Sequence, residues 1–147
     1  MIPPHDQFGL LPPGLHWTAD PNELAKRFAV GARRRRLFDG FIEGSYLLRL
    51  AGCRFVYLDG SFVTTKELPE DFDACWDPLG VQLEKLDPVF FDFNNFRQAQ
   101  KARFGGEFFP SGAQAEGPAR TFFEFFQINK DTGAPKGLVA FKLSSLQ

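Results

Sequence analysis

Cysteine, methionine and histidine are scarce in this sequence, whose 147 residues hold two, one and two of them. Cys53 and Cys75 lack the spacing of metal ligands and are too few for a disulfide framework, so we expect two buried thiols. No run of about 18 apolar residues is present, and residues 1–14 lack the cationic and then apolar pattern of a secretory leader. These absences predict a cytoplasmic protein that does not span a membrane.

An excess of charge of either sign is also lacking. Seventeen Lys and Arg residues oppose 18 Asp and Glu residues, which gives a net charge of −1. No overall field therefore draws the protein to nucleic acid or to an anionic membrane, and any site for a polyanion must be local. The hydrophobic share of 44% and the charged share of 24% are those of a folded protein, and the length is that of one domain, residues 1–147.

Phenylalanine is abundant, with 19 copies, which predicts a core built largely from aromatic rings. Four prolines predict that residues 1–17 form an extended surface arm. Periodicity, capping residues and turn residues predict helices at 21–30, 32–51, 96–104 and 121–127, and strands at 53–59, 71–76, 89–93 and 137–143. This order indicates an α+β domain, in which a small twisted mixed sheet carries helices on one face.

The most informative segment begins where the first predicted strand ends, at Gly60 and Ser61. A Gly-Ser turn exposes backbone N–H groups and a hydroxyl, which together make a small nest for phosphate oxygens. After nine more residues come Asp71 and Asp73, whose carboxylates share one face of a strand while Phe72 enters the core. The pair repels itself unless a cation neutralises it, and Mg²⁺ takes one or two carboxylates and completes its shell with phosphate oxygens and water. The pattern is typical of a site for a nucleoside triphosphate.

The segment from residue 55 to residue 76 resembles the signature of the DNA polymerase β-like nucleotidyltransferase superfamily. That signature is an apolar residue, Gly-Ser, about a dozen residues or fewer, and then Asp-apolar-Asp. The Leu-Pro-Pro-Gly opening and the block Tyr-Leu-Asp-Gly-Ser-Phe-Val-Thr also resemble a set of small prokaryotic proteins placed in that superfamily. The nearest small relatives in architecture are minimal nucleotidyltransferases of toxin–antitoxin and phage-defence modules, some of which act on RNA ends and some on partner proteins.

This resemblance implies a Mg²⁺-dependent transfer of a nucleoside monophosphate from an NTP to a hydroxyl of an RNA or protein acceptor. Two Mg²⁺ ions are expected, with Mn²⁺ as a substitute, and an antitoxin or toxin is an expected partner. Gly60 and Ser61 would hold the β- and γ-phosphates, and Asp71 and Asp73 would ligate the metals. The superfamily has a third acid on a later strand, and the matching residue here is Asp92, which would ligate metal and help to activate the acceptor hydroxyl.

One departure concerns the residue after the Gly-Ser pair. Many small members have an Arg there that reaches the phosphates, whereas this sequence has Phe62. Either the charge comes from Lys66 or from a helix that carries Arg97, Lys101 and Arg103, or triphosphate binding is weak. Arg97 and Lys101 are four residues apart on one predicted helix face, which makes them the preferred phosphate or acceptor contacts.

Simpler interpretations compete at several positions. The run of four arginines at 33–36 could bind an RNA backbone or an acidic protein face, but it is most simply a solvated surface. The phenylalanine pairs within 122–126 could stack bases, but they are most simply core or a partner interface. His5 and His16 have no second ligand nearby, and Asp59 is interpreted as a turn acid.

Two other functions also remain open from the sequence. One is a catalytically silent member that binds a protein or nucleic acid, which the missing Arg favours. The other is a different metal-dependent phosphoryl enzyme, such as a nuclease, in which the acids activate water.

Overall fold

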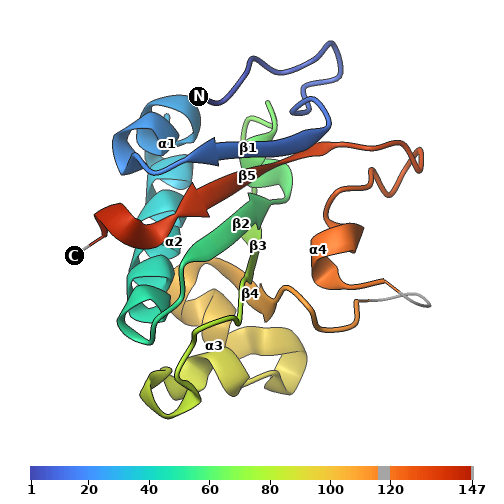
Figure 1. Ribbon diagram of the computed structural model, residues 1–147. Helices are drawn as coiled ribbons and strands as arrows, with labels where there is room; N and C mark the ends of the chain where they lie inside the picture. Colours follow the sequence, from blue (N-terminus) through green and yellow to red (C-terminus); the bar gives the residue numbers. More distant parts are fainter. Residues whose placement is uncertain (116–119, 147) are drawn as a thin grey trace.

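The chain forms a five-stranded sheet flanked by helices, in a computed structural model that describes residues 1–115 and 120–146 (Figure 1). The strands are β1 (Gly14–Thr18), β2 (Phe55–Asp59), β3 (Phe72–Trp76), β4 (Gly106–Pro110) and β5 (Gly137–Lys142). The α-helices are α1 (Pro21–Phe28), α2 (Ala32–Leu50), α3 (Asn94–Phe104) and α4 (Phe122–Phe125). Short 3₁₀ turns lie at Ser61–Val63, Leu83–Lys85, Pro88–Phe91 and Leu143–Ser145.

The sheet is mixed, with the order β1, β5, β2, β3, β4. β2 pairs antiparallel with both β5 and β3, whereas β1 is parallel to β5 and β4 is parallel to β3. Parallel neighbours need a crossover connection, and α3 lies in the crossover from β3 to β4. The predicted α+β class and the small mixed sheet are confirmed.

Most of the predicted elements form where their sequence signals lie. Asp20 accepts a hydrogen bond from the Asn22 N–H and caps α1, which begins with Pro21 at its first turn. Thr121 and Glu124 form the reciprocal capping box that predicts α4. Both cysteines are buried free thiols, as expected, and burial raises the pKa of Cys53 to about 12.

The strand predicted at 89–93 is wrong. Asp87 accepts a hydrogen bond from the Val89 N–H at 3.0 Å and Pro88 fixes the first turn, so a 3₁₀ turn forms there instead. Phe93 holds the cap position of α3, and Asn95, Phe96 and Arg97 depart from helical geometry with left-handed backbone conformations. Residues 116–119 of the predicted loop at 110–119 lie outside the described residues.

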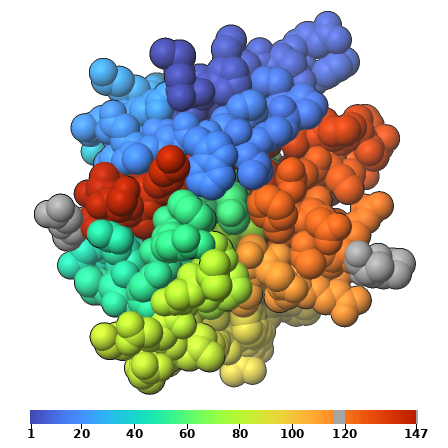
Figure 2. Space-filling model, in the orientation of Figure 1, coloured from blue at the N-terminus to red at the C-terminus, as the bar shows by residue number. Residues whose placement is uncertain are grey.

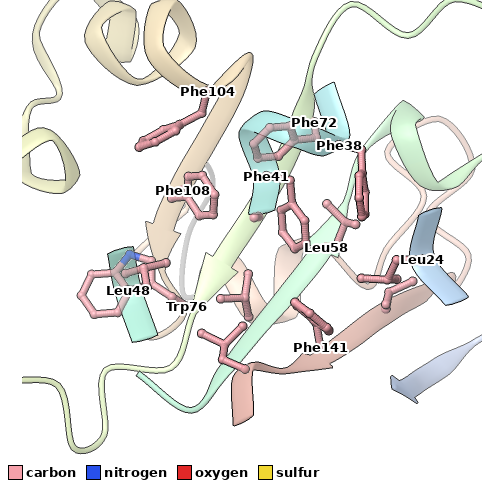
Figure 3. Close-up of a cluster of buried hydrophobic side chains, with 14 of the residues drawn as sticks. Leu24, Phe38, Phe41, Leu48, Leu58, Phe72, Trp76, Phe104, Phe108 and Phe141 are labelled. Carbon is pink, nitrogen blue, oxygen red and sulfur yellow. The ribbon is translucent and has the colours of Figure 1, made fainter. Parts of the chain in front are cut away.

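The main core lies between the sheet and α1, α2 and α3. Its large side chains come from alternate strand positions and from one face of α2, and Figure 3 shows Phe41 of α2 among Phe72, Phe108 and Phe141 of the sheet. The ring centroids of Phe41 and Phe72 are 5.5 Å apart in an edge-to-face arrangement. The prediction of a phenylalanine-built core is confirmed.

The opposite face of the sheet carries a smaller cluster of buried residues, formed by Cys75, Phe109, Phe126 and Leu138. α4 lies over this face, so helices cover parts of both sides. The N-terminal arm, dark blue in Figure 2, runs along the surface as predicted, and its last residues pair as β1. This arrangement leaves the end of the second face near Asp59 and Asp73 for a site.

Candidate functional site

The bend after β2 requires glycine at position 60. Gly60 has φ 85° and ψ −172°, a backbone conformation that is essentially restricted to glycine. A Cβ atom at this position would lie 2.9 Å from Oδ2 of Asp73 and 3.2 Å from its backbone nitrogen. The Gly60–Ser61 bend therefore packs directly against the Asp73 carboxylate, so the structure brings these predicted site residues together.

Three acidic residues form a row across neighbouring strands. Asp59 of β2 is in register with Asp73 of β3, and Asp73 is in register with Glu107 of β4. Directly opposed side chains on one sheet face have Cβ atoms about 4.5–5.5 Å apart. Asp71 immediately precedes β3 and is two residues from Asp73, so it extends the same face at the strand end. We call Asp59, Asp71, Asp73 and Glu107 the acidic row.

Cations neutralise the acidic row at both of its sides. Lys136 lies 2.8 and 3.0 Å from the two carboxylate oxygens of Asp59. On the other side, Glu107 Oε1 is 3.3 Å from Nε of Arg97 and 3.0 Å from Nζ of Lys101. Arg97 and Lys101 therefore meet at one acid, although Arg97 has a left-handed backbone conformation and the two do not share the regular helix face that their spacing predicted.

Asp73, at the centre of the row, has no ion pair within the described residues. Burial, and next the charge of Asp59, raise the pKa of Asp73 to about 7. Burial, and next the charge of Glu107, raise the pKa of Asp71 as well, while Lys101 and Lys66 act in the opposite direction. Within the described residues, Asp71 and Asp73, two of the three acids that the sequence assigned to metal, are thus the members of the acidic row without an ion pair.

The raised pKa of Asp73 makes stability depend on pH. Its value of about 7 exceeds the ordinary 3.8, so folding takes up a proton between these pH values and stability falls as pH rises from about 4 to 7. Asp73→Asn removes this loss. We expect the variant to exceed the wild type by about 2–4 kcal/mol in free energy of unfolding at pH 8, and by little near pH 4.

Urea unfolding in EDTA at several pH values measures this difference. Asp92→Asn is the control, because Asp92 lies outside the acidic row and should show no such pH-dependent gap. A constant difference between Asp73→Asn and the wild type from pH 4 to pH 8 would contradict the assignment.

Asp92 does not occupy the place that the sequence predicted for it. It ends the 3₁₀ turn Pro88–Phe91, and its carboxylate accepts a hydrogen bond from the Asn94 N–H at 3.1 Å. Glu107 instead supplies the acid on a strand beside Asp73. The signal was present in the sequence, because Gly105 ends α3 and a short run from Gly106 to Pro110 then combines two phenylalanines with one acid.

The other predicted cations are divided between two places. Lys66 is exposed, and its charge acts to lower the pKa of Asp71. Arg103 pairs instead with Glu43 and Asp87. Sequence reasoning missed Lys136, which comes just before β5 and is brought to Asp59 by the pairing of β5 with β2. It also treated Asp59 as a turn acid, whereas this side chain is buried and ion-paired.

One member of the arginine run is buried, which corrects the expectation of a solvated surface there. Arg34 lies on the inner face of α2 and donates hydrogen bonds to the carbonyls of Phe28, Phe62, Thr64 and Lys66. Arg33, Arg35 and Arg36 are exposed. Arg34 therefore fixes the loop that leaves the Gly60–Ser61 bend.

A cavity of about 450 Å³ opens beside the acidic row. Asp73, Glu107 and Arg97 line one part of it, and five phenylalanines line the rest, namely Phe96, Phe109, Phe122, Phe125 and Phe126. Phe109 and Phe122 stack with ring centroids 4.0 Å apart. A charged part and an aromatic part are thus joined in one space.

A family model matches residues 3–142, and its description is a family of unknown function, DUF6932. The chain belongs to this family. No curated protein and no solved structure matches the chain. Membership of DUF6932 therefore places the fold and the site just described in a family without assigning a reaction to them.

Two further findings bear on metal and membrane. None of the helices in the described part of the chain is long and apolar enough to span a bilayer. Within residues 1–115 and 120–146, no group of three or more His, Cys, Asp and Glu side chains is placed to hold a metal ion. The donor set instead fits Mg²⁺ that arrives with a nucleotide, because such ions use one or two carboxylates and take further oxygens from phosphates. Asp71 and Asp73 are the two carboxylates that could serve as such a pair.

Proposed function

We propose that this protein is a nucleotidyltransferase, which moves a nucleoside monophosphate from an NTP to a hydroxyl of an RNA or protein acceptor with the help of Mg²⁺. The observation that carries the proposal is the packing of the Gly60–Ser61 bend against Asp73, at the centre of the acidic row. This juxtaposition supports the proposal, because the resemblance to the DNA polymerase β-like superfamily implies a phosphate-binding Gly-Ser bend beside metal-binding carboxylates. The proposed setting is a toxin–antitoxin or defence module, with a cognate partner protein, in the cytoplasm.

The phosphates are held by the bend and by a lysine. In the proposal, backbone N–H groups at Gly60 and Ser61 and the Ser61 hydroxyl bind the β- and γ-phosphates. In many small members of the superfamily, an Arg after the Gly-Ser pair supplies positive charge to the phosphates. In the proposal, Lys136 supplies that charge here, since its ammonium group binds Asp59 next to the bend. Lys66 and Lys101 add to the positive charge around Asp71.

The reaction needs an acceptor hydroxyl at the Glu107 end of the acidic row. The hydroxyl oxygen attacks the α-phosphorus, the bond from that phosphorus to the bridging oxygen breaks, and pyrophosphate leaves. Glu107 takes the hydroxyl proton, in the role that the sequence assigned to Asp92. Bound magnesium would supply neutralisation of the negative charge that develops on the attacking and leaving oxygens.

Titration of ATP, CTP, GTP and UTP with Mg²⁺ tests the proposal by calorimetry. We expect the double variant Asp71→Ala, Asp73→Ala to bind these nucleotides at least tenfold more weakly, because the carboxylates that hold the metal are gone. Glu84→Ala with Asp131→Ala is the matched control, since it removes two acids from exposed positions. Equal affinity in the first variant and the wild type would contradict the proposal.

A second candidate is a catalytically silent protein that binds a partner or nucleic acid. It is favoured by the ion pairs of Asp59 with Lys136 and of Glu107 with Lys101, which stabilise the fold without a metal. Incubation with labelled NTPs, total RNA and lysate proteins separates the candidates. Label transfer supports the enzyme, binding without transfer supports the silent protein, and shortened RNA without transfer supports a nuclease.

A further inference from the structure

The aromatic part of the cavity is built from elements that lie far apart in the sequence. Phe109 comes from β4, Phe122 and Phe125 come from α4, and Phe126 follows α4 directly, over the same face of the sheet. Phe96 of α3 is the fifth phenylalanine of the lining. The volume of about 450 Å³ is within the range of sites for small ligands. Because Asp73 lines this cavity and also contacts the Gly60 bend, a ligand held by the bend extends naturally toward the phenylalanines.

The aromatic part presents rings and few hydrogen-bonding groups. Phenyl side chains have neither donors nor acceptors. The backbone of α4 is already occupied, since the N–H groups of Phe125 and Phe126 donate to the carbonyls of Thr121 and Phe122. The charged residues that line the cavity, Asp73, Glu107 and Arg97, all lie at or beside the acidic row, where Arg97 pairs with Glu107. A planar ring in this space can stack on the phenylalanines, but few groups there can form hydrogen bonds with its edge.

We propose, on the basis of the proposed function, that this cavity takes the base of the nucleotide and selects purines over pyrimidines by ring size alone. Bases stack on aromatic side chains whatever their hydrogen-bonding pattern, and a purine has more ring area to stack than a pyrimidine. Strong discrimination between similar ligands needs buried polar groups that the wrong ligand leaves unpaired, and the phenylalanine walls offer none. Adenine and guanine are therefore accepted about equally.

One part of the cavity wall, at Phe96 and Arg97, belongs to an unusual turn. Asn95, Phe96 and Arg97 all have positive φ, between 52° and 63°, a conformation that is unfavourable for residues other than glycine. Phe96 lines the cavity although 80% of its surface is exposed, and the guanidinium of Arg97 lies 5.0 Å from the Phe109 ring centroid. This turn places Phe96 where it can cover one face of a bound base.

The binding of nucleoside monophosphates in EDTA tests the cavity in the absence of metal and of the transfer reaction. Calorimetric or NMR titration should give affinities for AMP and GMP within about threefold of each other, and each at least about fivefold tighter than those for CMP and UMP. Phe125→Ala should weaken AMP binding about tenfold. Phe123→Ala should leave AMP binding unchanged, because Phe123 lies on the same helix but packs on Tyr57 outside the cavity. Phe96→Ala gives a second variant with little risk to folding, with the exposed Phe8→Ala as its control.

Three results would overturn the inference: equal affinity for all four nucleotides, a tenfold preference between AMP and GMP, or unchanged AMP affinity in both Phe125→Ala and Phe96→Ala. The assay of label transfer from NTPs distinguishes the proposed enzyme activity from the proposed purine-selective cavity. Purine-selective binding without label transfer upholds the cavity and removes the enzyme, whereas equal transfer from all four NTPs upholds the enzyme and removes the purine selectivity.

Discussion

Glu107→Gln is expected to slow nucleotidyl transfer by about 10²- to 10⁴-fold, which is the usual contribution of a group that takes a proton in the reaction. Glu107 is in register with Asp73 and lines the cavity, and in the proposed reaction its carboxylate takes the proton of the acceptor hydroxyl. Gln keeps the size of the side chain but cannot take the proton. Transfer of label from an α-labelled NTP measures the rate.

Asp92→Asn is the matched control for this prediction, because both variants replace an acid by its amide. Asp92 lies outside the sheet, where its carboxylate accepts a hydrogen bond from the Asn94 N–H. The Asp92→Asn variant should therefore transfer label at a rate within about twofold of the wild type. Thermal unfolding should accompany both measurements, since Glu107→Gln leaves Arg97 and Lys101 without their acid. A large loss of transfer rate in Asp92→Asn, with a normal rate in Glu107→Gln, would instead assign the proton-accepting role to Asp92, as the sequence predicted.

Arg34→Met should lower the free energy of unfolding by about 3 kcal/mol, because several carbonyls lose a charged donor in a place that water reaches poorly. Two of these carbonyls, those of Thr64 and Lys66, accept hydrogen bonds of 2.8 and 2.6 Å from Nη2. A third belongs to Phe28, at the carboxyl end of α1, where a cation is also favoured by the helix dipole. Urea denaturation at pH 7 measures the loss.

Arg36→Met is the control for Arg34→Met, since it removes the same side chain from an exposed position two residues away on α2. Its effect should stay within about 0.5 kcal/mol, as is usual for surface substitutions. Equal losses in the two variants would contradict a specific role for Arg34. Because Arg34 fixes the loop after Ser61, its replacement should also weaken NTP binding, whereas the replacement of Arg36 should not.

Local signals were enough to predict the part of the site that lies within one stretch of chain. Gly60, Ser61, Asp71 and Asp73 come from a single hairpin-like segment, and the antiparallel pairing of β2 with β3 brings the bend onto Asp73. The α+β class followed in the same way from periodicity and caps, because those signals depend on neighbours in the sequence.

The rest of the site could not be predicted because it depends on pairing between distant segments. Glu107 and Lys136 reach the acidic row only through the pairing of β4 with β3 and of β5 with β2. Asp92 was misplaced because an apolar run predicts a strand, whereas Asp87 and Pro88 start a 3₁₀ turn there. Arg34 was misread because four adjacent charges conceal that one of them shares a helix face with buried Leu37 and Phe38.

The position of β5 has a consequence for how the protein is made. β5 is the last strand in the sequence, yet it lies between β1 and β2 in the sheet. A nascent chain on the ribosome therefore holds two strands whose shared neighbour has not been synthesised, and the sheet is completed only after residues 137–142 have been made. A stop codon before residue 137 would leave two open strand edges exposed to other chains, so such a fragment should aggregate rather than fold.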